Sequence, residues 1–470
     1  MIEARFDSDC ASHWNPRGLL AALLIGLAMI FGGGGSAAPA SELVLEAMAA
    51  AVFIGWIWLD RSGPRWRAPR SLWIIAALLI AVPLMQLIPL PPGIWHHLPG
   101  RETERDALAL VGQADHWRAW SVAPSRTFAA LLSLGPCILV MLMIAGLGRA
   151  GRAQAVAMVA AVGGIAMLVG AAQLAGGDDG AFRFYGTRSG NLEGFQANRN
   201  HAADVLLIAI VAFAAAAREW QERWRPALTG PAFPAMVLGV SALLSVAVIV
   251  TASRAGAVLL PLGWLGVLLV IRPSLRFDRR MFGALALVAV IVGLVGVWFI
   301  QHNHVIARIA ARFTLNQEFR PRIWADSVYA TRLYFPFGSG IGTFVPVFQA
   351  IERLENVDVF LTNRAHNDYL ELAIEGGAVA IAALLAIAAL ILRSAIKSIR
   401  RPPAESMAQV IFALVTLTVI ALHSQVDYPL RSMSLQCLAG LAVGLLIACS
   451  DSRRNSPGMP LKTASMKDDL

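Results

Sequence analysis

Charged residues are scarce in this sequence. Only 15% of its 470 residues are Asp, Glu, Lys or Arg, whereas 57% are hydrophobic, and the mean hydropathy is +0.62. A typical soluble globular domain has far more charge and fewer apolar residues. This composition excludes a soluble protein and indicates a membrane protein.

Cysteines and nucleotide-binding motifs are also lacking. The four cysteines, Cys10, Cys137, Cys437 and Cys449, form no C-x-x-C pattern and lie before or within apolar runs. Their placement excludes a disulfide framework and a C-x-x-C metal site, so redox chemistry is not expected. No cofactor is predicted. Since there is no Walker-type phosphate loop, dinucleotide fingerprint or obvious repeat, an ATP-driven pump is disfavoured.

Long apolar runs dominate the chain. A run of about 20 apolar residues is long enough to cross the hydrocarbon layer as a helix. We therefore predict an all-α, polytopic membrane protein with about 12 transmembrane helices. The runs lie near 18–34, 42–59, 71–90, 127–147, 153–174, 202–217, 232–250, 255–271, 281–300, 374–392, 407–422 and 432–449.

Basic residues are spread over the short loops. A net charge of +9 could suggest nucleic acid, but the positive-inside rule gives these residues a simpler role as topology signals. We predict a multi-pass protein of the inner membrane with both termini cytoplasmic and no nucleic-acid partner. The basic clusters that support this follow spans two, eight, ten and twelve: Arg61, Arg65, Arg67, Arg70; Arg272, Arg276, Arg279, Arg280; Arg393, Lys397, Arg400, Arg401; and Arg453, Arg454, Lys462, Lys467.

This topology divides the chain into five parts. We predict helices one to five with an outward loop at 91–126 in 1–174, helices six to nine in 175–301, a large outward loop at 302–373, helices ten to twelve in 374–450, and a cytoplasmic tail at 451–470. Loops this long are usually functional. The apolar residues of the 302–373 loop predict a folded, partly helical lid with a helix from Trp324 to Tyr334. In the 91–126 loop, Trp95 and the pair His96 and His97 are expected at the membrane interface.

The first apolar run could be mistaken for a signal peptide that is cleaved after Ala40. Cleavage is disfavoured because acidic residues precede the run.

Two polar clusters mark the outward ends of predicted spans. Asn198, Arg199, Asn200 and His201 open span six. A helix cap accounts for one asparagine but not for the whole run, so Asn198, Arg199 and Asn200 are candidate substrate-binding residues. Arg254 lies at the tip of the hairpin between spans seven and eight. Charge at a membrane boundary is costly and rarely without a role, although a snorkelling arginine is the alternative.

Arginines and glycines occur together in the long loop. Arg320 and Arg322 precede Trp324, and a glycine-rich stretch follows at 338–342. Guanidinium groups bind phosphate oxygens in pairs, and glycines let backbone approach a ligand, so a diphosphate-bearing substrate suits both. A solvated basic face and ordinary turns are the alternative interpretation.

A histidine flanked by carboxylates precedes span ten. His366 is followed by Asn367, Asp368 and Glu371. Histidine can accept a proton from a hydroxyl near neutral pH, so His366 is a candidate general base that Asp368 or Glu371 could orient. Asn367 and Asp368 are also possible substrate contacts, and a structural histidine is the alternative. A last polar cluster lies between the last two spans and could close the rim of the site, but loop polarity is the simpler interpretation: His423, Ser424, Gln425, Asp427, Tyr428 and Arg431.

Taken together, these motifs resemble the bacterial O-antigen ligase and polymerase family. The resemblance covers roughly residues 180–430 and is carried by Phe195–His201, Ser253–Gly256, Arg320–Trp324 and Arg364–Glu371. The sequence departs from the family pattern in having two arginines, Arg320 and Arg322, where the family has one, and the spacing to Trp324 favours Arg320. Residues 1–175 carry little motif similarity to the family and support the resemblance only through the number of their predicted spans.

The resemblance implies an all-helical glycosyltransferase of the C-type superfold that uses an undecaprenyl-diphosphate-linked glycan donor at the periplasmic face without a metal. By motif position, Arg254 and Arg320 would bind the donor diphosphate, and His366 would deprotonate or orient the acceptor hydroxyl. In-line attack would invert the anomeric carbon. The acceptor would be lipid A core or a growing glycan, for surface or exported polysaccharide.

Three other interpretations stay open. Relatives of this kind also load glycan onto protein, so a protein O-oligosaccharyltransferase is an alternative within the enzyme class. A transporter of polysaccharide or lipid-linked sugar would also need many spans, but its signature is paired halves with broken helices, which the sequence does not show. A structural scaffold would tolerate substitution of Arg254, Arg320 and His366.

Overall fold

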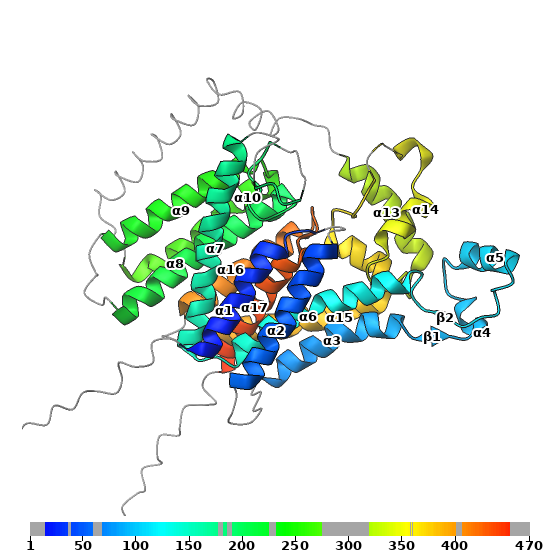
Figure 1. Ribbon diagram of the computed structural model, residues 1–470, viewed down its shortest axis with the longest axis horizontal. Coiled ribbons are helices and arrows are strands. Elements are labelled where there is room, and N and C mark those ends of the chain that lie inside the picture. The colour runs from blue at the N-terminus through cyan, green and yellow to red at the C-terminus, as the bar shows by residue number, and fades with distance from the viewer. Residues whose placement is uncertain are drawn as a thin grey trace, which may run out of the picture.

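The chain folds as a bundle of long helices (Figure 1). The computed structural model describes residues 15–35, 39–59, 68–176, 182–185, 190–224, 232–274, 319–357, 359, 361–400 and 407–451. Within these ranges the only strands are β1 (Pro89–Leu90) and β2 (Arg118–Ala119), which pair antiparallel. The predicted all-α class is confirmed.

Most of the helices are apolar. Among the described residues, eight are long and apolar enough to cross a membrane, and three shorter apolar helices accompany them. The eight are α2 (Pro39–Leu59), α6 (Pro124–Ala145), α7 (Arg149–Ala175), α8 (Arg199–Trp224), α9 (Ala232–Val250), α10 (Arg254–Ile271), α15 (Asp368–Arg400) and α17 (Met433–Asp451). The shorter three are α1 (Pro16–Phe31), α3 (Arg70–Gln86) and α16 (Met407–His423), and a 3-10 turn, η2 (Arg272–Ser274), follows α10.

Each of these apolar helices coincides with one predicted span. The remaining predicted span, at 281–300, lies outside the described residues, as does the 302–318 part of the long loop. The chain is therefore a multi-pass membrane protein, as predicted.

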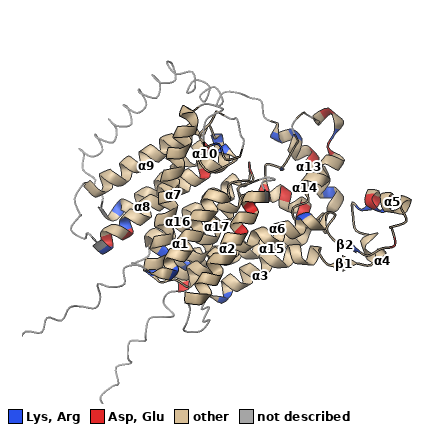
Figure 2. Cartoon of the chain, in the orientation of Figure 1, with Lys and Arg blue, Asp and Glu red and all other residues tan. Residues whose placement is uncertain are grey.

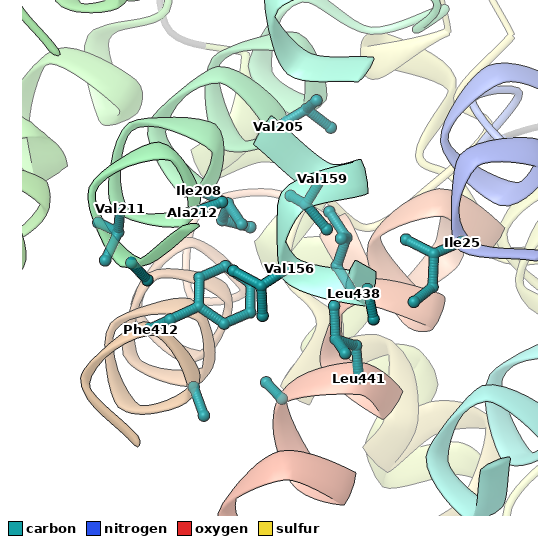
Figure 3. Packing of buried hydrophobic residues seen from close by; sticks show 14 of the residues in the cluster. Ile25, Val156, Val159, Val205, Ile208, Val211, Ala212, Phe412, Leu438 and Leu441 are labelled. Atoms are coloured by element: carbon teal, nitrogen blue, oxygen red, sulfur yellow. The ribbon is translucent and has the colours of Figure 1, made fainter. Parts of the chain in front are cut away.

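Helices α8 and α17 form the interior of the bundle. In each, 83% of the most apolar 18-residue window is buried, compared with 17% in α15 and 22% in α2. Helix α8 packs against α7, α9, α10 and α16, and α17 packs against α1, α6, α15 and α16. In Figure 3, Phe412 of α16 lies beside Val156 of α7 and Ala212 of α8. The alanine-rich sequence of α8 suits this position, because small residues let helices approach closely.

A small folded unit projects from one end of the bundle. It contains β1, α4 (Pro92–Trp95), α5 (Glu102–Leu110) and β2, and lies at the right of Figure 1. Trp95 is fully buried inside it, and the guanidinium carbon of Arg101 lies 5.4 Å from its ring centre. The structure thus differs from the expectation of Trp95 at the membrane interface, because this tryptophan forms the core of its own unit.

The described part of the long loop forms helices α13 (Arg320–Tyr334) and α14 (Phe344–Ile351) and the turn η3 (Leu354–Asn356). The predicted helix from Trp324 to Tyr334 is confirmed. An apolar cluster that includes Phe344, Phe348 and Ile374 packs these helices on the start of α15. The described part of the loop therefore rests on the end of a membrane-spanning helix.

The glycine-rich stretch at 338–342 packs against the protein itself. Gly338, Gly340 and Gly342 all have positive φ, which side chains rarely adopt. Gly340 lies against Ser121, and Gly342 lies against the backbone of Arg126. These contacts account for the glycines, so the interpretation that they admit a ligand is not needed.

Charged groups gather mainly near the ends of the bundle and in the projecting segments (Figure 2). At one end, Nε of Arg149 lies 3.0 Å from a carboxylate oxygen of Glu219, and Nζ of Lys397 lies 2.8 Å from Asp451. The other end carries the starts of α8, α10, α15 and α17 and the end of α16. The candidate site residues belong to this second end.

Candidate active site

Segments far apart in the sequence meet at this end of the bundle. The backbone N–H of Ala197 donates to the carbonyl of Gly33, Ser434 N–H donates to Gly32, and Asp368 N–H donates to Ser424. These bonds join the end of α1, the start of α8, the start of α15 and the turn between α16 and α17. That turn includes η5 (Pro429–Arg431) and lies at the centre of the site.

His366 is held in an unusual backbone conformation. Its φ is +50°, a left-handed conformation that costs energy for a residue other than glycine and is often found at functional sites. Its neighbour Ala365 is bonded on both sides: its carbonyl accepts from Trp324 Nε1 at 3.0 Å, and its N–H donates to Glu371 Oε2 at 3.0 Å. The surrounding structure thus keeps the strained residue in place.

The imidazole of His366 lies between two aromatic rings. Its centroid is 5.3 Å from that of Phe319 and 5.0 Å from that of Tyr428, and its side chain is 16% exposed. Both ring contacts are T-shaped, and the exposed part of the side chain remains accessible to a ligand. Phe319 immediately precedes α13, so this helix begins beside the histidine.

Asp427, rather than Asp368 or Glu371 as the sequence suggested, is the partner of His366, because the two predicted carboxylates bind Ser424 and Arg364. Oδ1 of Asp427 lies 3.1 Å from Nδ1 of His366 and accepts the N–H of Tyr428 at 3.0 Å, and Oδ2 accepts from the side-chain amides of Asn198 and Asn200. Burial alone raises the pKa of Asp427, but the hydrogen bond to His366 and the charges of His201, His366 and His423 together hold this pKa well below its usual range.

An ionised Asp427 orients the histidine for base catalysis. When Nδ1–H of an imidazole donates to a carboxylate, Nε2 carries the lone pair and can accept a proton. The tautomer is assigned from this hydrogen bond. The site thus contains a histidine and a carboxylate in the arrangement of a general base and its orienting group.

A second network fixes the start of α15. The guanidinium of Arg431 lies 3.7 Å from Asp368, 3.2 Å from Glu371 and 2.8 Å from Glu375. Burial lowers the pKa of Arg431, but the three carboxylates outweigh this effect and raise it above its usual value. Arg364 also donates to Glu371, at 3.0 Å. Because Arg364 and Arg431 are engaged with buried carboxylates, they hold the scaffold and are poorly placed to bind a substrate phosphate.

Arg254 and Arg320 start two helices at this end of the bundle. Arg254 is exposed at the start of α10, just after the capping residue Ser253, and Gly256 packs closely against Ala203 of α8. Arg320 is half-buried at the start of α13, where its charge acts on His423. Arg322 is exposed. The structure therefore brings Arg320 nearer to the interior of the site than Arg322.

The predicted substrate-binding residues mostly bind the protein itself. Asn367 Nδ2 donates to the carbonyl of Gln425 at 2.9 Å and its Oδ1 accepts the N–H of Leu370, while Asp368 Oδ2 accepts from Ser424 and from the N–H of Leu430. Asn198 and Asn200 bind Asp427, and Arg199 is half-buried at the start of α8. These contacts support positioning roles for the asparagines and Asp368.

Sequence reasoning missed the importance of the turn between α16 and α17. The sequence favours loop polarity over closure of the rim of the site for this turn. In the structure, Asp427 contacts His366, Asn198 and Asn200, and Arg431 contacts Asp368 and Glu371. The available signal was the density of polar residues in a short turn between two apolar spans. Among the described residues, no group of three or more His, Cys, Asp or Glu side chains is arranged to hold a metal ion.

The profile of the family described as O-antigen ligase matches residues 239–385. These residues form a domain of the O-antigen ligase family. The resemblance inferred from the motifs is thereby confirmed, and it supports glycan transfer of the ligase or polymerase type in general. No curated protein sequence matches the chain.

The O-antigen ligase domain includes only part of the site. It runs from α9 into α15 and contains Arg254, Arg320 and His366. Asp427, Arg431 and the asparagines at the start of α8 lie outside it. His366 of the domain contacts Asp427, which the rest of the chain supplies. The family in general implies a lipid-linked glycan and an acceptor as partners.

Proposed function

We propose that this protein transfers a glycan from an undecaprenyl-diphosphate donor to an acceptor hydroxyl, as a ligase or polymerase of surface polysaccharide. The observation that carries the proposal is the pairing of His366 with the ionised Asp427 at the end of the bundle where α10 and α13 begin with Arg254 and Arg320. A base and two cations are what this reaction requires.

The proposed chemistry follows from these groups. Nε2 of His366 takes the proton of the acceptor hydroxyl while the hydroxyl oxygen attacks the anomeric carbon of the donor. Arg254 and Arg320 bind the diphosphate and offset the charge that develops as it leaves. Attack from the face opposite the leaving group inverts the anomeric carbon, and the arginines supply the charge stabilisation without a metal.

The proposed location is the bacterial inner membrane, with the site facing the periplasm and both termini cytoplasmic. The ends of α1 and α16 and the starts of α8, α10, α15 and α17 share one face of the bundle, as the alternation of predicted spans requires. Arg272 just after α10, and Lys397 and Arg400 in the last turn of α15, lie at the opposite ends of those helices. The positive-inside rule assigns these ends to the cytoplasm.

A transfer enzyme suits the structure better than a transporter does. The site groups gather at one end of the bundle, whereas transporters bind substrate near the middle of the membrane between paired halves. Among transferases, a ligase that uses lipid A core, a polymerase and a protein O-oligosaccharyltransferase share the same donor chemistry. The acceptor distinguishes them.

The test uses purified protein, a lipid-diphosphate-linked glycan and candidate acceptors. We expect His366→Ala to lower the rate of transfer by about 10²–10⁴-fold, the range of a general base, with little change in thermal stability. His97→Ala, an exposed histidine of the projecting unit, is the control and should keep full activity.

The same variants should be examined in a deletion strain for lipopolysaccharide, free polysaccharide and glycoprotein. The product that the deletion strain no longer makes identifies the acceptor. Full transfer by His366→Ala, or accumulation of glycan on the cytoplasmic side in the deletion strain, would contradict the proposal.

A further inference from the structure

The start of α13 packs against the segment that carries His366. The ring of Phe319, which immediately precedes the helix, lies 5.3 Å from the ring of His366. One turn further along, Ile323 belongs to the same buried apolar cluster as Ala365. Next to it, Nε1 of Trp324 donates to the carbonyl of Ala365 at 3.0 Å. The first turns of α13 and residues 365 and 366 are therefore packed together as one unit.

Arg320 lies within these same turns. Helix positions four apart are neighbours on one face, so Arg320 and Trp324 lie one above the other on α13. Arg320 is half-buried there. The helix that carries the proposed donor cation is thus also the helix that binds the residue next to the proposed base, His366.

The carbonyl that Trp324 binds is itself held firmly. Ala365 is fully buried, and its N–H donates to Oε2 of Glu371 at 3.0 Å. Glu371 is also fully buried and lies 3.2 Å from Nε of Arg431. The bond from Trp324 therefore joins α13 to a point that α15 already fixes, immediately before the strained backbone of His366.

The packing of α13 does not depend on this hydrogen bond. The buried Asp326 accepts from Nε of Arg353 at 2.6 Å and from Nδ2 of Asn356 at 2.8 Å, which attaches α13 to η3. The apolar cluster that contains Ile323 and Phe344 attaches it to α14. What the indole N–H adds is a directional bond between the helix and the segment of the base.

We propose that Trp324 is a positioning residue that, with Phe319, fixes Arg320 relative to His366, so that the donor diphosphate and the acceptor hydroxyl are aligned for attack. This inference rests on the proposed function. Transfer between two bound groups depends on their alignment, and a misplacement of about 1 Å can cost about 10²-fold in rate. Trp324 acts through Arg320 and His366 and not on the substrate itself.

The alternative is that Trp324 only stabilises the folded loop. In that case the loss of its N–H lowers the rate by the same factor whether or not Arg320 and His366 are present. Trp324→Phe removes the N–H and keeps an aromatic ring. Trp264→Phe is the matched control, because Nε1 of Trp264 donates at 3.2 Å to Oγ of Ser245 inside the bundle.

The experiment is a double-mutant cycle with purified protein and a labelled lipid-diphosphate-linked glycan. We expect Trp324→Phe to lower kcat on the order of tenfold, with little change in KM, and Trp264→Phe to keep the wild-type kcat. When Arg320→Ala or His366→Ala is already present, adding Trp324→Phe should lower the rate by less than about twofold. Effects of residues that act as one unit are not additive, and neither of these proteins has a pair left to align.

Thermal unfolding shows whether each variant is folded. If Trp324→Phe does not fold, Phe319→Leu takes its place in the cycle with the same expected pattern, because Phe319 is 56% exposed and its ring contacts His366 directly.

Two results would overturn the positioning role while transfer by wild type still supports the proposed function. One is an unchanged kcat in the folded variant. The other is a further fall of about tenfold when Arg320→Ala or His366→Ala is already present, since independent effects multiply. Absence of transfer by wild type overturns the proposed function and the positioning role together.

Discussion

At the scale of single residues, the site depends on Asp427 as much as on His366. The carboxylate is fully buried and yet binds a histidine, two asparagine amides and a backbone N–H. His366 was predictable, because a histidine among carboxylates before a span is a recognisable pattern. Its partner was not, since 61 positions separate the two residues and nothing local in the sequence joins them.

Replacing Asp427 should therefore affect both stability and activity. We expect Asp427→Asn to lower the free energy of unfolding at neutral pH by about 1–3 kcal/mol, because buried donors lose a charged acceptor, and to reduce transfer. The native pKa of Asp427 lies below the ordinary value of about 3.9. Its contribution to stability is thus fully present above about pH 4 and is lost as the pH falls towards the native pKa.

Thermal unfolding in detergent between neutral pH and pH 3 tests this expectation. The difference in Tm between wild type and Asp427→Asn should shrink at the acid end. Asp115→Asn, which changes an exposed aspartate of the projecting unit, serves as the control with no difference at any pH. A constant difference would show that the carboxylate charge is not the cause.

At the scale of elements, α15 links the site to the membrane and is broken at Gly377. This residue has φ +56° and ψ −151° inside the helix, and the next residue, Ala378, donates its N–H to the carbonyl of Pro336 at 2.8 Å. The break lets the first turns of α15 carry Asp368, Glu371 and Glu375 to Arg431 while the remainder crosses the bundle. The sequence predicted the span but not the break, because Gly376 and Gly377 are also compatible with a continuous membrane helix.

Gly377→Ala should destabilise the protein by about 1–3 kcal/mol, the cost of a side chain held at positive φ. The added Cβ would also meet the backbone of Phe337 and Gly338. Gly164→Ala in α7 is the matched control, since nothing lies within 4 Å of its added Cβ, and helix propensity predicts a gain of up to about 1 kcal/mol. Thermal unfolding measures both, and equal behaviour of the two variants would contradict a required break.

At the scale of the whole molecule, the bundle has one end with the site and one end with basic loops. This polarity predicts opposite accessibility of its two ends in cells. In a background without native cysteines, Gln113→Cys in the projecting unit should react with a membrane-impermeant maleimide added from the periplasm. Arg400→Cys at the far end of α15 should react only after the inner membrane is opened. Both positions are exposed, and reversed labelling would place the site in the cytoplasm.

The positions of the helices followed from local composition alone. A chain in lipid must bond its own backbone groups, so each apolar run of sufficient length becomes a helix wherever it lies. The predicted spans within the described residues therefore agree with α1 to α3, α6 to α10 and α15 to α17. The candidate base and arginines were also recognisable, because their motifs are short and continuous in the chain.

The partners of those residues depended on how the helices pack. Asp427 and Arg431 lie between two apolar spans, where a polar residue alone does not indicate what it faces. The packing of the turn before α17 against the start of α15 brings Asp427 to His366 and Arg431 to Asp368. A contact between helix ends distant in the sequence is a property of the folded bundle, so no local pattern could supply it.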